Sequence, residues 1–205
     1  MKKPRVKIVS CDYDGTLASF FDLSHEKGIK KFRDDMRIFV DCLSVIKEAE
    51  NLDKIYFSLN TRENRLDVLT KALTIILNEE EWLLPGPQFI GGNVYSYSED
   101  DKLLSEPMVD CEEQGYHCYD KLGNLVVFAL EHAKYETVVT VTHIEDGKNY
   151  CESKLSPLRE VGIETKILNL PSMNERGARP IRTVLLEVVM EQVSAVLNKT
   201  KNKQL

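Results

Sequence analysis

The stretch from Val6 to Leu17, VKIVSCDYDGTL, decides the fold that we expect for the rest of the chain. It begins with a short apolar, β-branched run, Val6 to Ser10, which predicts a β-strand. Gly15 follows closely, and a glycine at such a position ends a strand. Two carboxylates, Asp12 and Asp14, lie between the run and the glycine. We therefore expect both side chains at the carboxyl end of a buried strand.

Apolar runs and helical spacings alternate along the rest of the chain. Apolar residues at helical spacing predict helices over 29–50, 66–77, 122–132 and 183–197, and a helix end at 158–161 that Gly162 stops. Further strands are predicted over 54–59, 88–90, 137–144 and 163–168. Strands that alternate with helices predict an α/β fold, a doubly wound and mostly parallel sheet with helices on both faces.

Polar residues follow three of these strands. Asp12 and Asp14 follow the first, Asn60 to Arg62 follow the strand 54–59, and Glu145 and Asp146 follow the strand 137–144. In parallel sheets, ligands bind at the carboxyl ends of the strands, near the point where the strand order reverses. We therefore expect these residues to contribute to one site.

Asp12 and Asp14 can converge on one point because Gly15 turns the chain after them. Two carboxylates at one site repel each other and need a cation or a shared proton. A hard cation with oxygen ligands fits, and magnesium is the common choice with phosphates. An isolated D-x-D pair would fit a surface turn equally well. The full stretch Asp12–Leu17 after an apolar strand favours the site.

Asp12 to Leu17, D-Y-D-G-T-L, resembles the first motif, D-x-D-G-T-L, of the haloacid dehalogenase-like (HAD) hydrolases in its phosphatase form. The resemblance implies a Rossmann-like core and a covalent aspartyl-phosphate on Asp12. It implies that Asp14 protonates the leaving alcohol and then deprotonates the attacking water. It also implies that Mg²⁺ is held by the Asp12 carboxylate and the Asp14 backbone carbonyl. A carboxylate attacks phosphorus once cations screen the phosphate charge, and a second carboxylate serves both half-reactions.

The second motif of the family, a Ser or Thr after the second strand, has two registers in this chain. Asn60-Thr61-Arg62 is similar to the T-G-R run of sugar-phosphatase branches, with Asn60 in the Thr position. Ser58 gives the other register. The resemblance implies that these residues hold the phosphate, with Arg62 as a phosphate or substrate contact. Alternatively, Asn60 and Thr61 cap the following helix.

The third motif is a lysine that screens the nucleophile and the phosphate. Lys121 stands where the resemblance implies it, before the helix that precedes the strand 137–144. A lone lysine is most often only solvated. Lys148 and Lys154 compete for the same role.

The fourth motif follows the strand 137–144. Glu145-Asp146-Gly147-Lys148-Asn149-Tyr150 resembles G-D-G-x-N-D, with Asp146 on the metal-binding aspartate. Glu145 replaces a glycine and Tyr150 replaces the second acid. The metal is then held through Asp146 and water, or Glu145 contributes a ligand. An ordinary turn at Asp146 is the plainer interpretation, and the order of the four motifs along the chain argues against it.

Size and composition restrict the remaining choices. The 205 residues predict one domain, 1–197, and a polar tail, 198–205. The net charge of −6 argues against a nucleic-acid binder, which would show a basic face. Five cysteines without a C-x-x-C pair fit reduced thiols in a cytoplasmic compartment. We expect neither a signal peptide nor a transmembrane segment, because no run approaches roughly 18 apolar residues.

Cap domains that close over small substrates are inserted at two places in the family, and both places are short here. The first holds only a flap around 20–28, and the second, 93–120, holds a small cap or hairpin insert. An open site suits a large substrate, so we expect a phosphoprotein, with phosphotyrosine as one candidate. Four tyrosines of the second segment could line the site or be ordinary strand residues: Tyr95, Tyr97, Tyr116 and Tyr119.

Two other functions stay open. One is a phosphatase of small metabolites, in the sugar- or lipid-phosphate class. The other is a catalytically weak binding protein with the HAD fold, which the substitutions at Asn60, Glu145 and Tyr150 favour. A dehalogenase does not fit, because that branch needs neither Asp14 nor magnesium.

Overall fold

The computed structural model describes about two-thirds of the chain. The described residues are 2–13, 15–17, 23–60, 88–90, 93–95, 121–146, 152–171, 175, 177 and 179–202. The helix predicted over 66–77 lies outside them.

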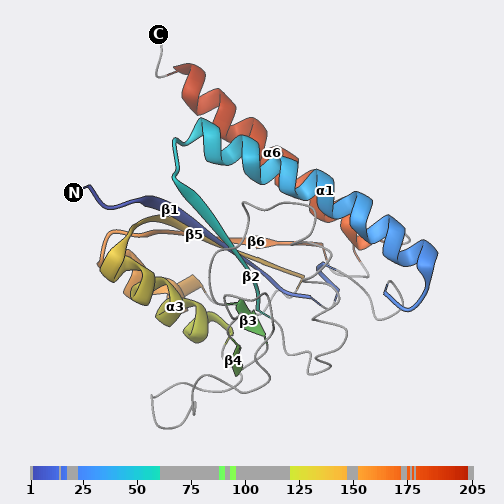
Figure 1. Ribbon diagram of the computed structural model, residues 1–205, viewed down its shortest axis with the longest axis horizontal. Helices are drawn as coiled ribbons and strands as arrows, with labels where there is room; N and C mark the ends of the chain where they lie inside the picture. Colours follow the sequence, from blue (N-terminus) through green and yellow to red (C-terminus); the bar gives the residue numbers. More distant parts are fainter. Residues whose placement is uncertain are drawn as a thin grey trace.

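A four-stranded sheet forms the centre of the molecule (Figure 1). Its strands are β1 (Arg5–Cys11), β2 (Lys54–Leu59), β5 (Thr137–Glu145) and β6 (Glu164–Asn169). Their order is β2-β1-β5-β6, and every neighbouring pair is parallel. β1 is buried along almost its whole length because it has a strand on each side and helices on both faces. The predicted α/β fold with a parallel sheet is confirmed.

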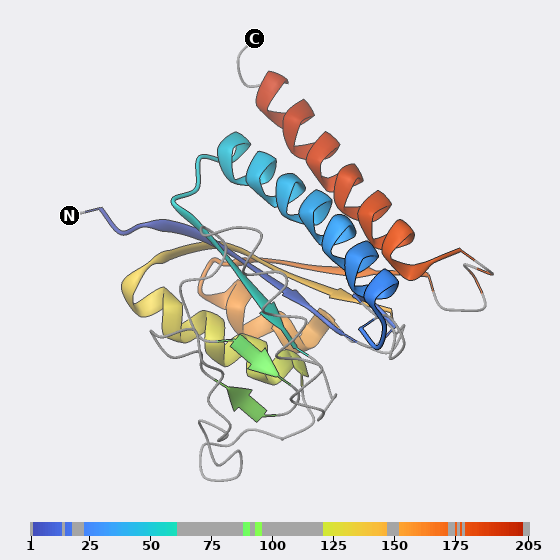
Figure 2. The same cartoon turned by 45° about the vertical axis from the view of Figure 1, so that its right-hand side comes forward.

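Helices cover both faces of this sheet. On one face lie α1 (Glu26–Ala49) and α6 (Ile181–Asn202), which run side by side (Figures 1 and 2). On the other lie α3 (Lys121–Tyr135), the short α4 (Ser156–Glu160) and a 3-10 turn, η1 (Glu152–Leu155). The strand order reverses at β1, because the chain adds β2 on one side of it and then β5 on the other.

The face under α1 and α6 holds the larger hydrophobic cluster. The apolar stripe predicted for α1 is buried: Phe32, Met36, Phe39, Val40, Leu43 and Ile46. It packs against apolar residues of β1, β2 and α6. A buried ion pair joins the two helices, with Arg182 Nε 2.7 Å from Asp35 Oδ2. The helical spacing in the sequence therefore identified the buried face of α1.

The face under α3 holds a second cluster. Leu122, Leu125 and Phe128 of α3 pack there against Val6 and Ile8 of β1. Together the two clusters place apolar layers on both faces of the sheet at β1. The polar residues predicted to form the site follow the strands at their carboxyl ends.

Two predicted boundaries and the place of one predicted strand differ from the structure. α1 begins at Glu26, so it includes the last part of the flap predicted around 20–28. α6 continues to Asn202, into the segment predicted as a tail, where the Thr200 hydroxyl donates to Ala49 O at 3.4 Å. β3 (Gln88–Ile90) is a strand as predicted, but it pairs antiparallel with β4 (Asn93–Tyr95) in a separate sheet. Of the hairpin or small cap predicted over 93–120, only Asn93–Tyr95 lies within the described residues.

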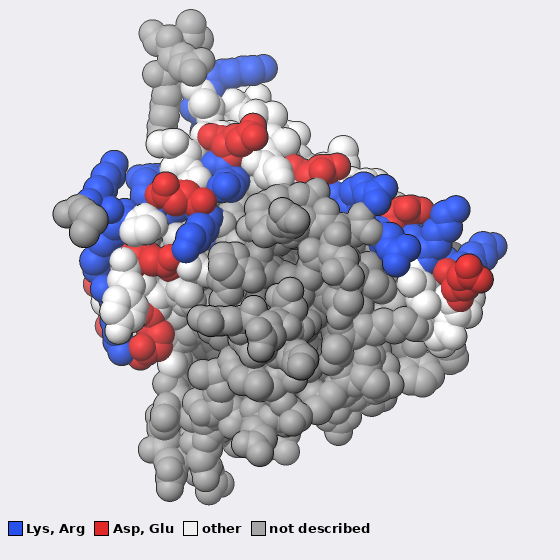
Figure 3. All heavy atoms as spheres, in the orientation of Figure 1, with Lys and Arg blue, Asp and Glu red and all other residues white. Residues whose placement is uncertain are grey.

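Charges are mixed on the visible face of the described residues. In Figure 3, basic and acidic side chains lie next to one another, as they do along α1. Among the described helices, none combines the length and apolar character that crossing a membrane requires.

Candidate metal and active site

The ends of three neighbouring strands are joined by backbone hydrogen bonds. Asp12 N donates to Ile144 O at 2.9 Å, and Asn60 N donates to Cys11 O at 2.9 Å. These bonds continue the pairing of β1 with β5 and β2 by one residue beyond the strands. Asp12 and Asn60 therefore lie at one edge of the sheet, where the strand order reverses.

Three carboxylates meet at this edge. One oxygen from each of Asp12, Glu145 and Asp146 lies within 4.8 Å of the others. Asp12 is 5% exposed, Glu145 is 3% exposed and Asp146 is half-buried. Carboxylates this close repel one another unless a cation or a proton lies between them. The structure thus brings Asp12 and Asp146 together, and Glu145 joins them.

The donor set and the backbone both fit a hard divalent cation. Carboxylate oxygens are the ligands of Mg²⁺ and Ca²⁺, whereas softer metals prefer sulfur or imidazole. Gly15 has a φ of +76°, and a Cβ atom at this position would lie 2.3 Å from Asp146 Oδ2. A glycine is therefore required for Asp146 to come this close to the turn after Asp12. The cluster could hold the predicted metal through Asp12, Glu145 and Asp146.

A buried histidine stands directly behind Glu145. His143 is fully buried, its Nδ1 lies 3.2 Å from Ser10 Oγ, and its Nε2 lies 3.4 Å from Glu145 Oε2. Ser10 and His143 are also register partners in the pairing of β1 with β5. Ser10 precedes Asp12 by two positions, and His143 precedes Glu145 by two positions. Each therefore lies on the same face of its strand as that acidic residue. A chain of contacts thus leads from Ser10 through His143 to the carboxylate cluster.

Sequence reasoning missed Ser10 and His143. Both lie inside strands, where a polar residue in an apolar run has no distinguishing spacing. The signal that could have found them is the i, i+2 relation to Asp12 and Glu145, because alternate residues of a strand lie on one face.

The second motif is described only in part. Asn60 is fully buried at the end of β2, next to the strand that leads to Asp12. Ser58, the other register, is also fully buried, and its hydroxyl has no hydrogen-bond partner among the described residues. Thr61 and Arg62 lie outside the described part of the chain. Both registers therefore reach the same end of the sheet.

The remaining predicted site residues are described incompletely. Lys121 is the first residue of α3, as the third motif requires, but its side chain lies outside the described part. Asp14, the predicted acid and base, and Lys148 lie outside it too. Lys154, the other competitor, is exposed in η1. The side chains of the four tyrosines predicted near the site are likewise outside the described residues.

Comparisons of the chain with protein-family models, with curated proteins and with solved structures found no match in any of the three. The functional argument therefore depends on the site itself.

Proposed function

We propose that the chain is a Mg²⁺-dependent phosphomonoester hydrolase of the HAD type that acts through an aspartyl-phosphate on Asp12. The observation that carries the proposal is the buried cluster of Asp12, Glu145 and Asp146 at the point where the strand order reverses. The D-x-D-G-T-L resemblance points to the reaction, and the position of the cluster at the carboxyl ends of β1 and β5, where ligands bind in parallel sheets, supports it.

In the proposed reaction, a carboxylate oxygen of Asp12 forms a bond to phosphorus while the bond from phosphorus to the ester oxygen breaks. Asp14 gives its proton to the leaving oxygen. Water then attacks the aspartyl-phosphate, Asp14 accepts the proton of that water, and inorganic phosphate leaves with Asp12 restored. Mg²⁺, held by Asp12, the Asp14 carbonyl and Asp146, would screen the phosphate charge. Asn60 with Thr61, Arg62 and Lys121 would hold the phosphate.

The proposed substrate is a phosphoprotein. One observation supports an open site: α1 begins at Glu26, soon after the first motif, so the first position for a cap domain has room only for a short segment. Phosphopeptides, including phosphotyrosine peptides, are then expected to be hydrolysed faster than sugar phosphates. A preference for sugar or lipid phosphates would instead support the metabolite phosphatase.

The experiment that tests the reaction is hydrolysis of para-nitrophenyl phosphate with Mg²⁺. Asp12→Asn is expected to lower kcat by at least ~10³-fold, because the amide is a poor nucleophile. Asp41→Asn, an exposed aspartate of α1, is the matched control and is expected to keep full activity. Full activity in Asp12→Asn would contradict the mechanism. Absence of activity in the wild-type chain, with Mg²⁺ binding intact, would support the binding-protein alternative.

A further inference from the structure

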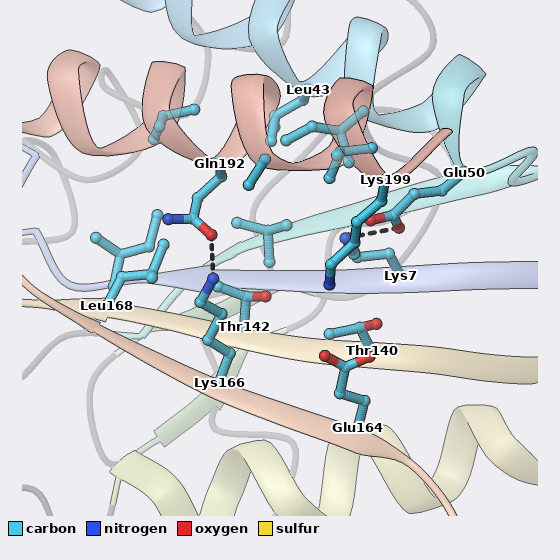
Figure 4. Close-up of a pocket in the computed structure, with 16 residues that line it drawn as sticks. Lys7, Leu43, Glu50, Thr140, Thr142, Glu164, Lys166, Leu168, Gln192 and Lys199 are labelled. Carbon is cyan, nitrogen blue, oxygen red and sulfur yellow. Dashed lines mark hydrogen bonds and ion pairs between the residues drawn. The ribbon is translucent and has the colours of Figure 1, made fainter. Parts of the chain in front are cut away.

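A cavity lies between α6 and the sheet, alongside β1, β5 and β6 (Figure 4). Its volume of about 120 Å³ is well above the roughly 10–15 Å³ that one water molecule needs. It is below the roughly 300–1,000 Å³ of pockets for drug-sized ligands. The cavity therefore suits a ligand of a few heavy atoms.

The sheet face under α6 changes character along the strands. Register partners form three rows, which from amino to carboxyl ends are Lys7–Thr140–Glu164, Val9–Thr142–Lys166 and Cys11–Ile144–Leu168. The first row is polar and the last is apolar. α6 changes in the same way, because Leu185 and Val189 belong to the apolar cluster whereas Gln192 and Lys199 further along the helix are polar; Val189, Gln192 and Lys199 line the cavity. The cavity lies where the polar parts of the sheet and the helix face each other.

Positive charge exceeds negative charge at the cavity wall. Three ammonium groups and two carboxylates line it, those of Lys7, Lys166, Lys199, Glu50 and Glu164. Lys7 is paired with Glu50, with Nζ 2.7 Å from Oε2, and Lys166 donates to the neutral Gln192 Oε1. Lys199 extends from α6 toward the sheet beside Lys7 and has no ion-pair partner within the described chain. The wall therefore favours a ligand with a negative charge.

Two buried hydroxyls also face the cavity. Thr140 is 6% exposed and Thr142 is 9% exposed, and both line it. Neither hydroxyl has a hydrogen-bond partner in the part of the chain that the structure describes. Hydroxyls that line a cavity and have no protein partner are suited to donate to a ligand oxygen.

The opposite side of the cavity is apolar. It is lined by Val9, Leu43, Ile46, Ile144, Leu168 and Val189. A charged end and an apolar end within one small cavity match a ligand that has both characters. A second cavity of about 270 Å³, lined by Arg5, adjoins the first and shares Glu50, Thr140, Glu164, Val196 and Lys199 with it. The guanidinium of Arg5 adds a further positive charge beside the first cavity.

We propose that this cavity binds a small aliphatic carboxylate. Its carboxylate would contact Lys199 and the hydroxyls of Thr140 and Thr142, and its hydrocarbon part would contact the apolar side. Inorganic phosphate fits less well, because it has no apolar part and would lie near the carboxylates of Glu50 and Glu164. The proposal does not depend on the proposed phosphatase activity, since the two sites share no residue.

The test ligand is butyrate, which is added to the ¹⁵N-labelled full chain. EDTA is present so that no metal bound at Asp12, Glu145 and Asp146 can attract the butyrate carboxylate. Backbone amide shifts of β5, β6 and α6 are expected to saturate with a dissociation constant on the order of 1 mM. Butanol lacks the negative charge of butyrate and so tests whether binding needs that charge. Phosphate lacks a hydrocarbon part and so tests whether binding needs an apolar part of the ligand. Both are expected to bind at least about fivefold more weakly. Failure of the shifts to saturate, or equal affinity for either control compound, would overturn the proposal.

Two variants locate the site. Lys199→Met is expected to weaken butyrate binding at least about fivefold by removing the free cation. Ala195→Phe is expected to abolish it by filling the cavity. Both residues are exposed, so the fold is expected to persist, which the amide spectrum checks. Lys201→Met, on the same helix but not lining the cavity, is the matched control with unchanged affinity. Wild-type affinity in Lys199→Met and Ala195→Phe would place the ligand elsewhere and overturn the assignment.

Discussion

The carboxyl ends of the strands and their amino-terminal halves differ in charge. At the carboxyl ends, Asp12, Glu145 and Asp146 bring three acidic groups together. On the amino-terminal halves, Lys7 and Lys166 with Lys199 of α6 bring three basic groups to one cavity. The same strands β1 and β5 build both regions. A single parallel sheet thus offers one place suited to a cation and another suited to an anion.

The two regions are assembled in different ways. The acidic cluster depends on where the chain turns after its strands end, and so on the backbone at Gly15. The basic cavity depends on strand register, because Lys7, Thr140 and Glu164 lie in one row across three strands. A substitution at the turn around Gly15 is therefore expected to affect the acidic cluster alone. A substitution within a row of register partners is expected to affect the cavity alone.

The largest expected effect comes from Gly15→Ala. The new Cβ would lie 2.3 Å from Asp146 Oδ2 at a φ of +76°, so that backbone strain and a clash add together. We expect the free energy of unfolding to fall by about 3 kcal/mol and Mg²⁺ affinity to fall at least ~10-fold. Urea unfolding and Mg²⁺ titration measure the two effects.

Gly162→Ala is the matched control for this change. Gly162 has a φ of +82° and no atom within 4 Å of a Cβ placed there, so only the backbone strain applies. A loss of about 1 kcal/mol without any change in Mg²⁺ affinity is expected. Equal effects in both variants would show that the close approach of Asp146 has no role.

A smaller effect is expected from His143→Leu, which removes the contact at 3.4 Å to Glu145 Oε2. If His143 positions Glu145 for the metal, Mg²⁺ affinity falls roughly 10-fold. His143→Gln is expected to restore part of it, because its side-chain amide can donate to the same oxygen. Calorimetric titration with Mg²⁺ measures both.

His132→Leu is the control for the histidine, since it removes a His–Glu contact of 2.8 Å between His132 of α3 and Glu136, just after that helix. It is expected to leave Mg²⁺ affinity unchanged. If His143→Leu also bound Mg²⁺ like the wild type, Glu145 would not need His143 for its position.

The smallest effect is expected at the basic cavity. Thr142→Val keeps the shape of the side chain and removes a hydroxyl that lacks a partner in the described chain, so stability is expected to change by less than about 0.5 kcal/mol or to rise. Thr200→Val is the contrasting control, because it removes hydrogen bonds to Val196 O and Ala49 O. It is expected to lower stability by about 1 kcal/mol in thermal unfolding. A larger loss in Thr142→Val would show that its hydroxyl is already satisfied.

Local patterns predicted the fold well where they were long. The strand Lys54–Leu59 and the buried stripe of α1 follow the sequence because a continuous apolar run and helical spacing are properties of neighbouring residues. The antiparallel partner of β3 could not be predicted, because a strand of three residues carries no pattern. Nor could the end of α6, where a contact between Thr200 and the distant Ala49 extends a polar segment as helix.

The site was predictable to the extent that it lies at strand ends. Asp12 and Asp146 were paired from their positions alone, and the structure brings them together. His143 was not found, because its partner Ser10 comes from a different strand and only the register unites them. The basic cavity was missed for the same reason, since Lys7 and Thr140 become neighbours only after β1 and β5 pair.

The position of β1 between β2 and β5 also bears on how the molecule is assembled during translation. β1 and α1 leave the ribosome before β5 and α6, so β1 gains its second neighbour only when residues 137–145 emerge, and α1 gains α6 later still. Until then the apolar stripe of α1 and an open edge of β1 stay uncovered, which is the condition under which growing chains aggregate. Contacts this distant along the chain also make folding slow. The strand that carries Asp12 is therefore made before β5, the neighbour that completes its pairing.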